Sequence, residues 1–291
     1  MKKHIQPSTF SIVALDPEAK TWGVAVQSKF LAVGAVVPFA EAGVGAIATQ
    51  SFVNTSYGPN GLALMREGMS AQNVIDKLSA EDEGREHRQW GVVDASGNAA
   101  TFTGKDCHDW AGGQTGLNYT CQGNILANGN VVPAMAKAFE DSQGQPLAER
   151  LIASLSAGQA AGGDKRGQQS ASLFVVKEAA GYGGYTDHLV NLRVDDHTTP
   201  IEELARIYEL QQLYFGETQE TIELSGDTLQ SVQSMLNQLG YLDVASGQLD
   251  DATYKALDVF CGTENLEMRL GENSSKLDVE ILKFMQNLVK S

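Results

Sequence analysis

The sequence predicts an α+β fold in which two β-sheets are covered by helices on their outer faces, followed by a small all-α domain. Three observations support this prediction. The chain has 291 residues, more than one compact unit usually holds. Strand-like and helix-like segments alternate in blocks up to residue 215, and the composition then turns polar over 215–227. We therefore expect an N-terminal extension (1–8), a sandwich domain (9–218) and a three-helix domain (219–291).

The first block predicts a meander of buried strands. Its strand-like segments are TFSIVAL, GVAVQSKF, VGAVVPFA and VGAIATQS, separated by turn-like LDPEAKTWG and FAEAGVG. Apolar residues at helical spacing then predict two short helices, in PNGLALMREG and MSAQNVIDKLSAED. Strands return in RQWGVVDASGNAATFTG, where DASG supplies a hairpin turn.

The second block repeats this order of elements. A strand in YTCQGNILANG precedes two helices, NVVPAMAKAFEDS and PLAERLIASLSAGQA, and GQQSASLFVVKE is the next strand. A strongly amphipathic helix, IEELARIYELQQLYF, ends the block. Three more helices are predicted in DTLQSVQSMLNQLGYLD, DDATYKALDVFCG and KLDVEILKFMQNLVK, which form the C-terminal domain.

Charge and composition exclude several function classes. The formal net charge of −15 argues against nucleic acid and anionic membranes as partners, because both are bound mainly through Lys and Arg. No segment approaches the roughly 20 apolar residues of a membrane span, and the N-terminus lacks a signal peptide. Three cysteines without a C-x-x-C pair indicate a reducing compartment. We therefore expect a cytoplasmic protein.

No motif for a metal or cofactor is present. The five histidines show no H-E-x-x-H or H-x-x-x-H spacing, and there is no P-loop, dinucleotide fingerprint or G-x-S-x-G. Asp195-Asp196-His197 alternates between faces of an extended segment and is read as a polar strand end. We expect neither metal nor cofactor.

Two polar stretches interrupt apolar strands. In AGGDKRGQQSASLFVV, glycines surround a segment whose N–H groups can converge on an anion, and Arg166 could clamp a carboxylate. The alternative is a Gly-rich turn with incidental charge. In CQGNILANG, Gln122 and Asn124 face one side of a strand, where they form either a structural network or a ligand contact.

Thr9 begins the first predicted strand. A threonine hydroxyl is a weak nucleophile until a base takes its proton, and a free α-amine with a pKa of about 7.7–8.0 suits that task at neutral pH. One chain-terminal threonine would supply both groups. Threonine is, however, common in strands, so the residue alone favours a structural role.

Three long segments, TFSIVALDPEAKTWGVAVQSKFLAVGAVVPFAEAGVGAIATQSFVN, CQGNILANGNVVPAMAKAF and AGGDKRGQQSASLFVVKEAAGYGG, resemble a bacterial family, domain of unknown function 1028. That family is placed in the N-terminal-nucleophile (Ntn) hydrolase superfamily. The resemblance runs from about Thr9 to Phe215 and implies a four-layer αββα sandwich. It also implies a hydrolase acting on C–N (amide) bonds, in which Thr9 is the nucleophile and its own amine the base.

The resemblance assigns further residues to the site. Ser28 and Lys29, on the second strand, would tune the nucleophile, although Lys29 can also be read as an exposed strand lysine. Thr49 and Gln50 would contribute to an oxyanion hole. The family's GGD-x-RGQQS pattern, together with the amide pair, implies that the following residues bind substrate: Gln122, Asn124, Asp164, Arg166, Gln168, Gln169 and Ser170.

The extension MKKHIQPS departs from the family pattern. Relatives commonly carry the threonine directly behind the initiator methionine, whose removal exposes it. Here the Ser8–Thr9 bond would have to be cut, either by the protein itself or by another protease.

The C-terminal segment LQSVQSMLNQLGYLDVASGQLDDATYKALDVF resembles a three-helix peptidoglycan-binding domain appended to some family members. The usual Asp-Gly turn is replaced by ASGQLDD. The resemblance implies a cell-wall glycan partner, and the alternative is a helical module for packing or oligomerisation.

Two functions remain open from the sequence. The first is an amidohydrolase acting on a small amide or peptide-like substrate. The second is a non-catalytic protein on an Ntn-type scaffold that binds a small ligand or cell-wall fragment, with Arg166 and the amide cluster holding an anion. Oligomers are usual in the superfamily that the chain resembles, so a homo-oligomer is expected. Neither nucleic acid nor membrane is an expected partner.

Overall fold

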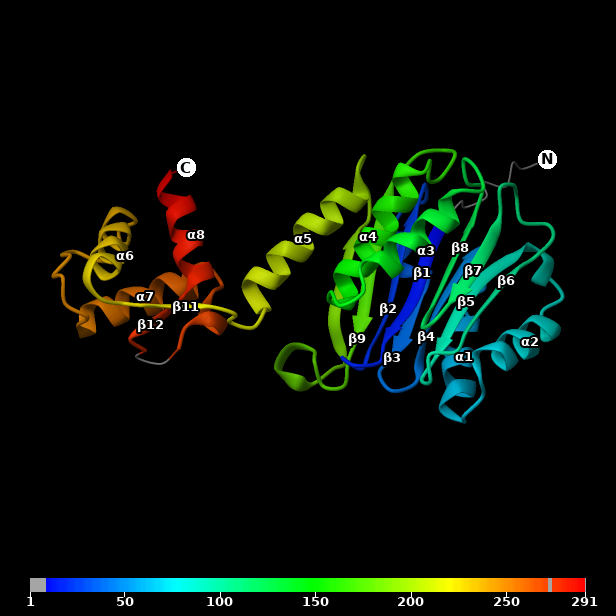
Figure 1. The fold of residues 1–291 in the computed structure, drawn as a ribbon, viewed down its shortest axis with the longest axis horizontal. Coiled ribbons are helices and arrows are strands. Elements are labelled where there is room, and N and C mark those ends of the chain that lie inside the picture. The colour runs from blue at the N-terminus through cyan, green and yellow to red at the C-terminus, as the bar shows by residue number, and fades with distance from the viewer. Residues whose placement is uncertain (1–8, 272–273, 291) are drawn as a thin grey trace. The chain divides into compact units, whose positions relative to one another are not determined.

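The computed structural model describes residues 9–271 and 274–290. The predicted extension, residues 1–8 with Ser8, lies outside the described residues. The chain forms two compact units, which divide between Arg206 and Ile207 (Figure 1).

The first unit contains a six-stranded antiparallel sheet. Its strand order is β10-β9-β2-β1-β8-β7, so the first strand of the chain lies near the middle of the sheet. The strands are β1 (Thr9–Asp16), β2 (Thr21–Ser28), β7 (Gly112–Gly116), β8 (Tyr119–Asn124), β9 (Ser170–Val176) and β10 (His188–Val194).

A second antiparallel sheet, with the order β3-β4-β5-β6, faces the first. Its strands are β3 (Pro38–Glu41), β4 (Gly45–Ser51), β5 (Arg88–Asp94) and β6 (Ala99–Thr103). Helices α3 (Val131–Asp141) and α4 (Leu147–Ala160) cover the outer face of the six-stranded sheet, and α1 (Tyr57–Arg66) and α2 (Ala71–Glu81) cover the outer face of the other (Figure 1). The predicted four-layer αββα sandwich is confirmed.

The space between the sheets has an apolar part and a polar part. The apolar part is built from valines and alanines that alternate along the strands and point inward, among them Val13, Val24 and Ala46. The polar part lies at the Thr9 end of β1, where Thr9, Ser11 and Val13 follow one another on the same face of the strand. The alternation of side chains along β1 therefore places Thr9 and Ser11 in the polar part.

Two local predictions differ from the structure. VGAVVPFA is predicted as a strand, but Val33–Ala35 forms a short 3₁₀ turn and β3 begins only at Pro38, because Ala32 adopts a left-handed conformation with φ of 53°. Strand β7 was not predicted, since its sequence GGQTG has little strand propensity.

The second unit is mainly helical and has its own buried core of leucine, valine and phenylalanine side chains. Helix α5 (Pro200–Phe215) crosses the boundary between the units. The remaining elements are β11 (Thr221–Glu223), α6 (Gly226–Gln238), α7 (Asp251–Thr263), β12 (Lys276–Asp278) and α8 (Val279–Lys290). The three predicted helices are present, accompanied by the short β11–β12 ladder. Among the described residues, no helix is both long and apolar enough to cross a membrane.

Candidate functional site

Thr9 is buried at the start of β1, between two neighbouring strands. It is 1% exposed and lies opposite Ser28 of β2 on one side and Asn124 of β8 on the other. Its Oγ1 donates a hydrogen bond to Ser28 Oγ at 3.1 Å. The structure thus brings together three of the residues predicted for the site.

Gln50 reaches Thr9 from the facing sheet. Its Nε2 donates to the Thr9 carbonyl oxygen at 3.3 Å and to the Gln122 carbonyl oxygen at 3.3 Å. Its Oε1 accepts from Ser11 Oγ at 2.6 Å, and Gln122 Nε2 donates to the same Ser11 Oγ at 2.6 Å. All four side chains are buried, so this hydrogen-bonding compensates for the removal of their polar groups from water.

Sequence reasoning missed two members of this network, Ser11 and Gln89. Gln89 Oε1 accepts from Gln50 Nε2 at 2.8 Å and from Asn124 Nδ2 at 2.9 Å. The signal that identified Gln122, a polar side chain on the buried face of an apolar strand, applies equally to Gln89 in RQWGVVD.

Thr49 lies away from this network. It is adjacent to Gln50 in β4, so its side chain points to the opposite face, where Oγ1 donates to the Asn54 carbonyl at 3.4 Å. The Thr49 N–H donates to the Val37 carbonyl at 3.1 Å. Both donors of Thr49 are therefore engaged within the fold.

A buried carboxylate organises the GGDKRGQQS loop beside Ser28. Asp164 is 3% exposed and accepts from Lys29 N at 2.8 Å and from Arg166 N at 2.8 Å. Arg166 Nη2 also reaches Asp164 at 3.1 Å, and its Nε at 3.3 Å. One edge of the Arg166 guanidinium is thus committed to its own loop. Gly163 and Gly167 adopt φ of 56° and 106°, which lets the loop turn around Asp164.

The other predicted residues of this loop hold the segment after β2. Ser170 Oγ donates to the Phe30 carbonyl and accepts from Val33 N. Gln169 donates through its backbone to the Ser28 carbonyl at 3.1 Å and through its side chain to Asp196. The half-buried Gln168 gives its carbonyl oxygen to Lys29 Nζ at 3.0 Å. The Lys29 side chain is exposed, so its ammonium lies at the rim rather than between the sheets.

A second ion pair fixes the loop that follows Gln50. Arg88 Nε donates to Asp82 at 2.9 Å, while Asn54 Nδ2 and Tyr57 Oη donate to the same carboxylate. The hydrogen bond from Arg88 and those from the neighbouring donors hold the pKa of Asp82 well below its usual range despite burial.

No described group offers a metal site or a reactive thiol. Within residues 9–271 and 274–290, no cluster of three His, Cys, Asp or Glu side chains is arranged to hold an ion. Burial raises the pKa of all three thiols, Cys107, Cys121 and Cys261, which keeps them in the protonated form. Among the residues predicted as catalytic, Thr9 and Ser28 carry hydroxyl groups.

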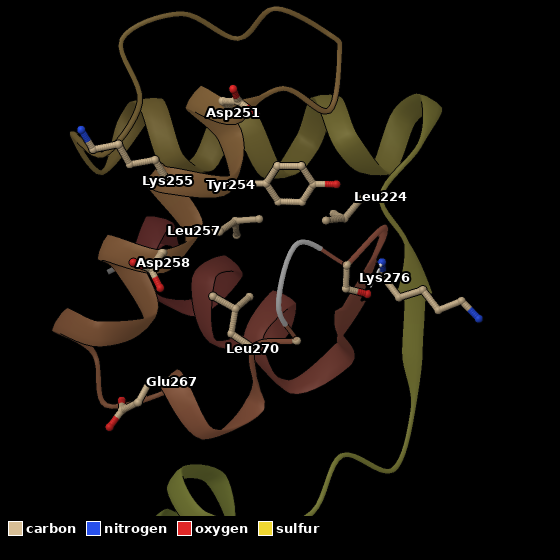
Figure 2. A pocket seen from close by; sticks show the side chains of 11 residues that line it. Leu224, Asp251, Tyr254, Lys255, Leu257, Asp258, Glu267, Leu270 and Lys276 are labelled. Atoms are coloured by element: carbon tan, nitrogen blue, oxygen red, sulfur yellow. Dashed lines mark hydrogen bonds between the residues drawn. The ribbon is translucent and has the colours of Figure 1, made fainter.

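The second unit contains a separate hollow of about 480 Å³. Tyr254 and Leu257 of α7 line it together with Leu224 and Leu270, and Figure 2 shows the Tyr254 ring directed toward Leu224. Asp251, Asp258, Glu267, Lys255 and Lys276 add charges of both signs to its lining.

Comparisons with known proteins agree with both resemblances. The model of a family of unknown function (DUF1028) matches residues 9–204, and the model of a "Putative peptidoglycan binding domain" matches residues 214–285. The crystal structure of protein SPO2555 from Silicibacter pomeroyi, assigned to DUF1028, is 30% identical, with a TM-score of 0.64. The match covers 76% of this chain and 92% of that one. No curated protein matches the chain.

Proposed function

Because this chain belongs to the DUF1028 family of unknown function, we propose its activity from the site itself: an Ntn-type amidohydrolase that cleaves a small amide or peptide-like substrate with Thr9 as nucleophile. The observation that carries the proposal is the buried Thr9 hydroxyl at the first position of β1, hydrogen-bonded to Ser28 Oγ at 3.1 Å. This bond holds the Thr9 hydroxyl in a defined direction beside a second hydroxyl, as a nucleophile in this position would require.

The proposal requires that the Ser8–Thr9 bond be cut, which frees the Thr9 amine. In self-cleavage, Thr9 Oγ1 attacks the Ser8 carbonyl carbon, its proton passes to the Thr9 nitrogen, and the C–N bond breaks to leave an ester. Water then hydrolyses the ester, releasing the Ser8 carboxylic acid and a free hydroxyl and amine on Thr9.

In the mature enzyme the Thr9 amine accepts the proton of Oγ1 as that oxygen attacks the substrate carbonyl carbon. The tetrahedral intermediate collapses when the amine returns the proton to the departing nitrogen, leaving an acyl ester on Thr9. Water, activated by the same amine, hydrolyses this ester and restores the threonine.

Neighbouring side chains have supporting roles in this scheme. Ser28 orients the Thr9 hydroxyl, and Gln50 holds the Thr9 carbonyl through Nε2. Asn124 lies opposite Thr9 in register and is the nearest strand neighbour on the other side. Lys29, whose ammonium donates to the Gln168 carbonyl, and Arg166, which is paired with Asp164, are the cations through which a substrate carboxylate would be recognised.

The mass of the purified protein tests the proposal. We expect the parent to lose everything before Thr9, Thr9→Ala to keep the bond intact, and Thr9→Ser to cleave, because it retains a hydroxyl. Ser28→Ala should cleave about tenfold more slowly or worse, since one hydrogen bond orienting the nucleophile is lost.

A chain that keeps the Ser8–Thr9 bond under all conditions, with Thr9→Ala behaving like the parent, would exclude the catalytic proposal. Unexplained ligand bound near Arg166 in such an intact chain would favour instead a binding protein on the same scaffold.

For the second unit, we propose that the hollow around Tyr254 contacts a peptidoglycan-type ligand. An aromatic ring beside carboxylates and ammonium groups offers both a stacking surface and hydrogen-bond partners to a sugar or short peptide. Co-sedimentation with insoluble peptidoglycan should be weakened by Tyr254→Ala. Val244→Ala, 71% exposed and lining a different hollow, is the matched control. Loss of binding in the control alone would indicate that the ligand binds in the hollow lined by Val244 instead.

A further inference from the structure

Gln89 lies at the centre of the polar network between the sheets. It is the second residue of β5, is fully buried, and lies opposite Gln50 in register. Its carboxamide reaches the six-stranded sheet, where Nε2 donates to the Gly123 carbonyl at 2.7 Å and to the Gly112 carbonyl at 3.3 Å. Nε2 also lies 3.0 Å from Thr103 Oγ1.

The contacts with the two carbonyls determine which way the Gln89 amide points. A backbone carbonyl oxygen can only accept, so the atom facing Gly112 and Gly123 must be the NH₂ group. The two ends of a glutamine amide are otherwise hard to tell apart, and here the main chain decides between them. Gln89 Oε1 consequently faces Gln50 Nε2 and Asn124 Nδ2.

The orientation of the Gln89 amide constrains the two amides that contact its Oε1, those of Gln50 and Asn124. Gln50 directs its NH₂ toward Gln89 Oε1 at 2.8 Å and also toward the Thr9 and Gln122 carbonyls, so Gln89 reinforces an orientation that the main chain favours as well. Gln50 Oε1 then faces Ser11 Oγ, whose hydroxyl donates to it. Asn124 likewise must direct its NH₂ to Gln89, which fixes the orientation of the amide beside Thr9.

We propose that Gln89 is a positioning residue for the Thr9 site, because its donation to the Gly112 and Gly123 carbonyls turns its Oε1 toward Asn124, whose amide it orients, and toward Gln50, whose amide it holds in place. The catalytic meaning of this role rests on the function proposed above for Thr9. The orienting role itself depends only on the network and can be tested separately.

The first measurement follows the side-chain amide signals of Gln50 and Asn124 by ¹⁵N NMR in the full chain. In Gln89→Met, a change of similar volume that removes the carboxamide, we expect these signals to shift and their hydrogen exchange to accelerate about tenfold or more, since each buried NH₂ loses the acceptor that Gln89 Oε1 provides. Thr103→Val is the matched control. It removes one partner of Gln89 but leaves both carbonyls, so the Gln50 and Asn124 signals should stay at their parent positions.

The second variant, Gln89→Glu, should restore the Gln50 and Asn124 signals when its carboxyl is protonated. A residue that acted only through packing would give no such dependence on protonation. A protonated carboxyl can donate to Gly123 and accept from Gln50, whereas an ionised one turns an oxygen toward each carbonyl. The Gln50 and Asn124 signals should therefore be close to those of the parent at low pH and depart from them reversibly as the pH rises. The parent should show no such transition. This readout also serves if Gln89→Met does not fold.

Cleavage of the Ser8–Thr9 bond gives the third readout. We expect Gln89→Met to cleave about tenfold more slowly or worse than Thr103→Val. Unchanged Gln50 and Asn124 signals in both Gln89 variants would overturn the positioning role. Altered signals in a protein whose parent never cleaves would support the positioning role while refuting the proposed catalysis.

Discussion

Replacing Arg269 by methionine should selectively destabilise the second unit. Arg269 has 5% of its side chain exposed and donates to Asp278, 1% exposed, at 2.7 Å. Two further donors of the same guanidinium bind the Gln212 and Leu213 carbonyls at the end of α5. The substitution leaves a buried carboxylate without its cation and two helix-end carbonyls without donors.

The expected loss follows from this burial. Removing one partner of a buried ion pair costs about 3–5 kcal/mol. For a unit of this size, each kcal/mol of lost unfolding free energy lowers the melting temperature by about 4–8 °C. The second unit should therefore melt at a temperature at least about 12 °C lower than in the parent. Lys283→Met is the matched control within the same unit. It breaks an ion pair of equal length, 2.7 Å, between exposed side chains, and should melt close to the parent.

The two units can be followed separately in the intact chain. All three tryptophans, Trp22, Trp90 and Trp110, belong to the first unit, so their fluorescence reports its unfolding alone. Far-UV circular dichroism and calorimetry report both units. An Arg269→Met transition coincident with that of Lys283→Met, or a shift seen by tryptophan fluorescence rather than by dichroism, would refute the reasoning.

The same ion pair gives the second unit a defined acid sensitivity. Burial opposes ionisation of Asp278, but hydrogen bonds from Thr218, the Glu280 N–H and Arg269 together hold its pKa below the usual value. The stabilisation is therefore complete above the unfolded pKa of about 3.9 and is lost as the pH falls through the lower folded pKa. Between these limits the parent should lose stability with falling pH more steeply than an Asp278→Asn variant, measured by dichroism.

Four further outcomes are expected. Gly91→Ala should destabilise the first unit, because its Cβ would lie 2.2 Å from Gln122 Oε1; tryptophan fluorescence measures this loss. Gly262→Ala in α7 has open space around it and should stabilise the second unit by about 1 kcal/mol, measured by denaturant titration followed by dichroism. Asp250 caps α7, and hydrogen bonds from Thr253 and Ser246 lower its pKa to about 2, so the stability difference between parent and Asp250→Asn should shrink as the pH falls from about 4 toward 2. Burial raises the pKa of Cys261 to about 12, so a thiol reagent should label it only when the second unit unfolds, at a rate that follows the dichroism transition.

The strand pattern predicted the two sheets well because buried alternation is a local property of sequence. It also identified Gln122 and Asn124 as polar residues on an inner face. It could not identify their partners, since Gln50 and Gln89 come from strands of the other sheet. Contacts between sheets depend on how the sheets are stacked, which no segment encodes alone.

The GGDKRGQQS loop shows a different limit. Its polar residues are conspicuous in the sequence, and the resemblance assigns them to substrate. In the structure Asp164 accepts a hydrogen bond from Arg166, two residues away, and Ser170 Oγ donates to the Phe30 carbonyl. Sequence spacing cannot distinguish a charge that awaits a ligand from one already paired within its own loop.

The division of the inter-sheet space into an apolar and a polar part also bears on how the sheets can move. Apolar contacts resist separation of two sheets but are nondirectional, so they oppose sliding only weakly. The bonds from Gln89 to Asn124 and to the Gly123 carbonyl, and from Gln50 to the Thr9 carbonyl, are directional and join the two sheets, so a slip of one residue, about 3.3 Å, would break them. The amide network therefore resists shear of the sheets at the end where Thr9 lies and maintains the distance from Gln50 to Thr9.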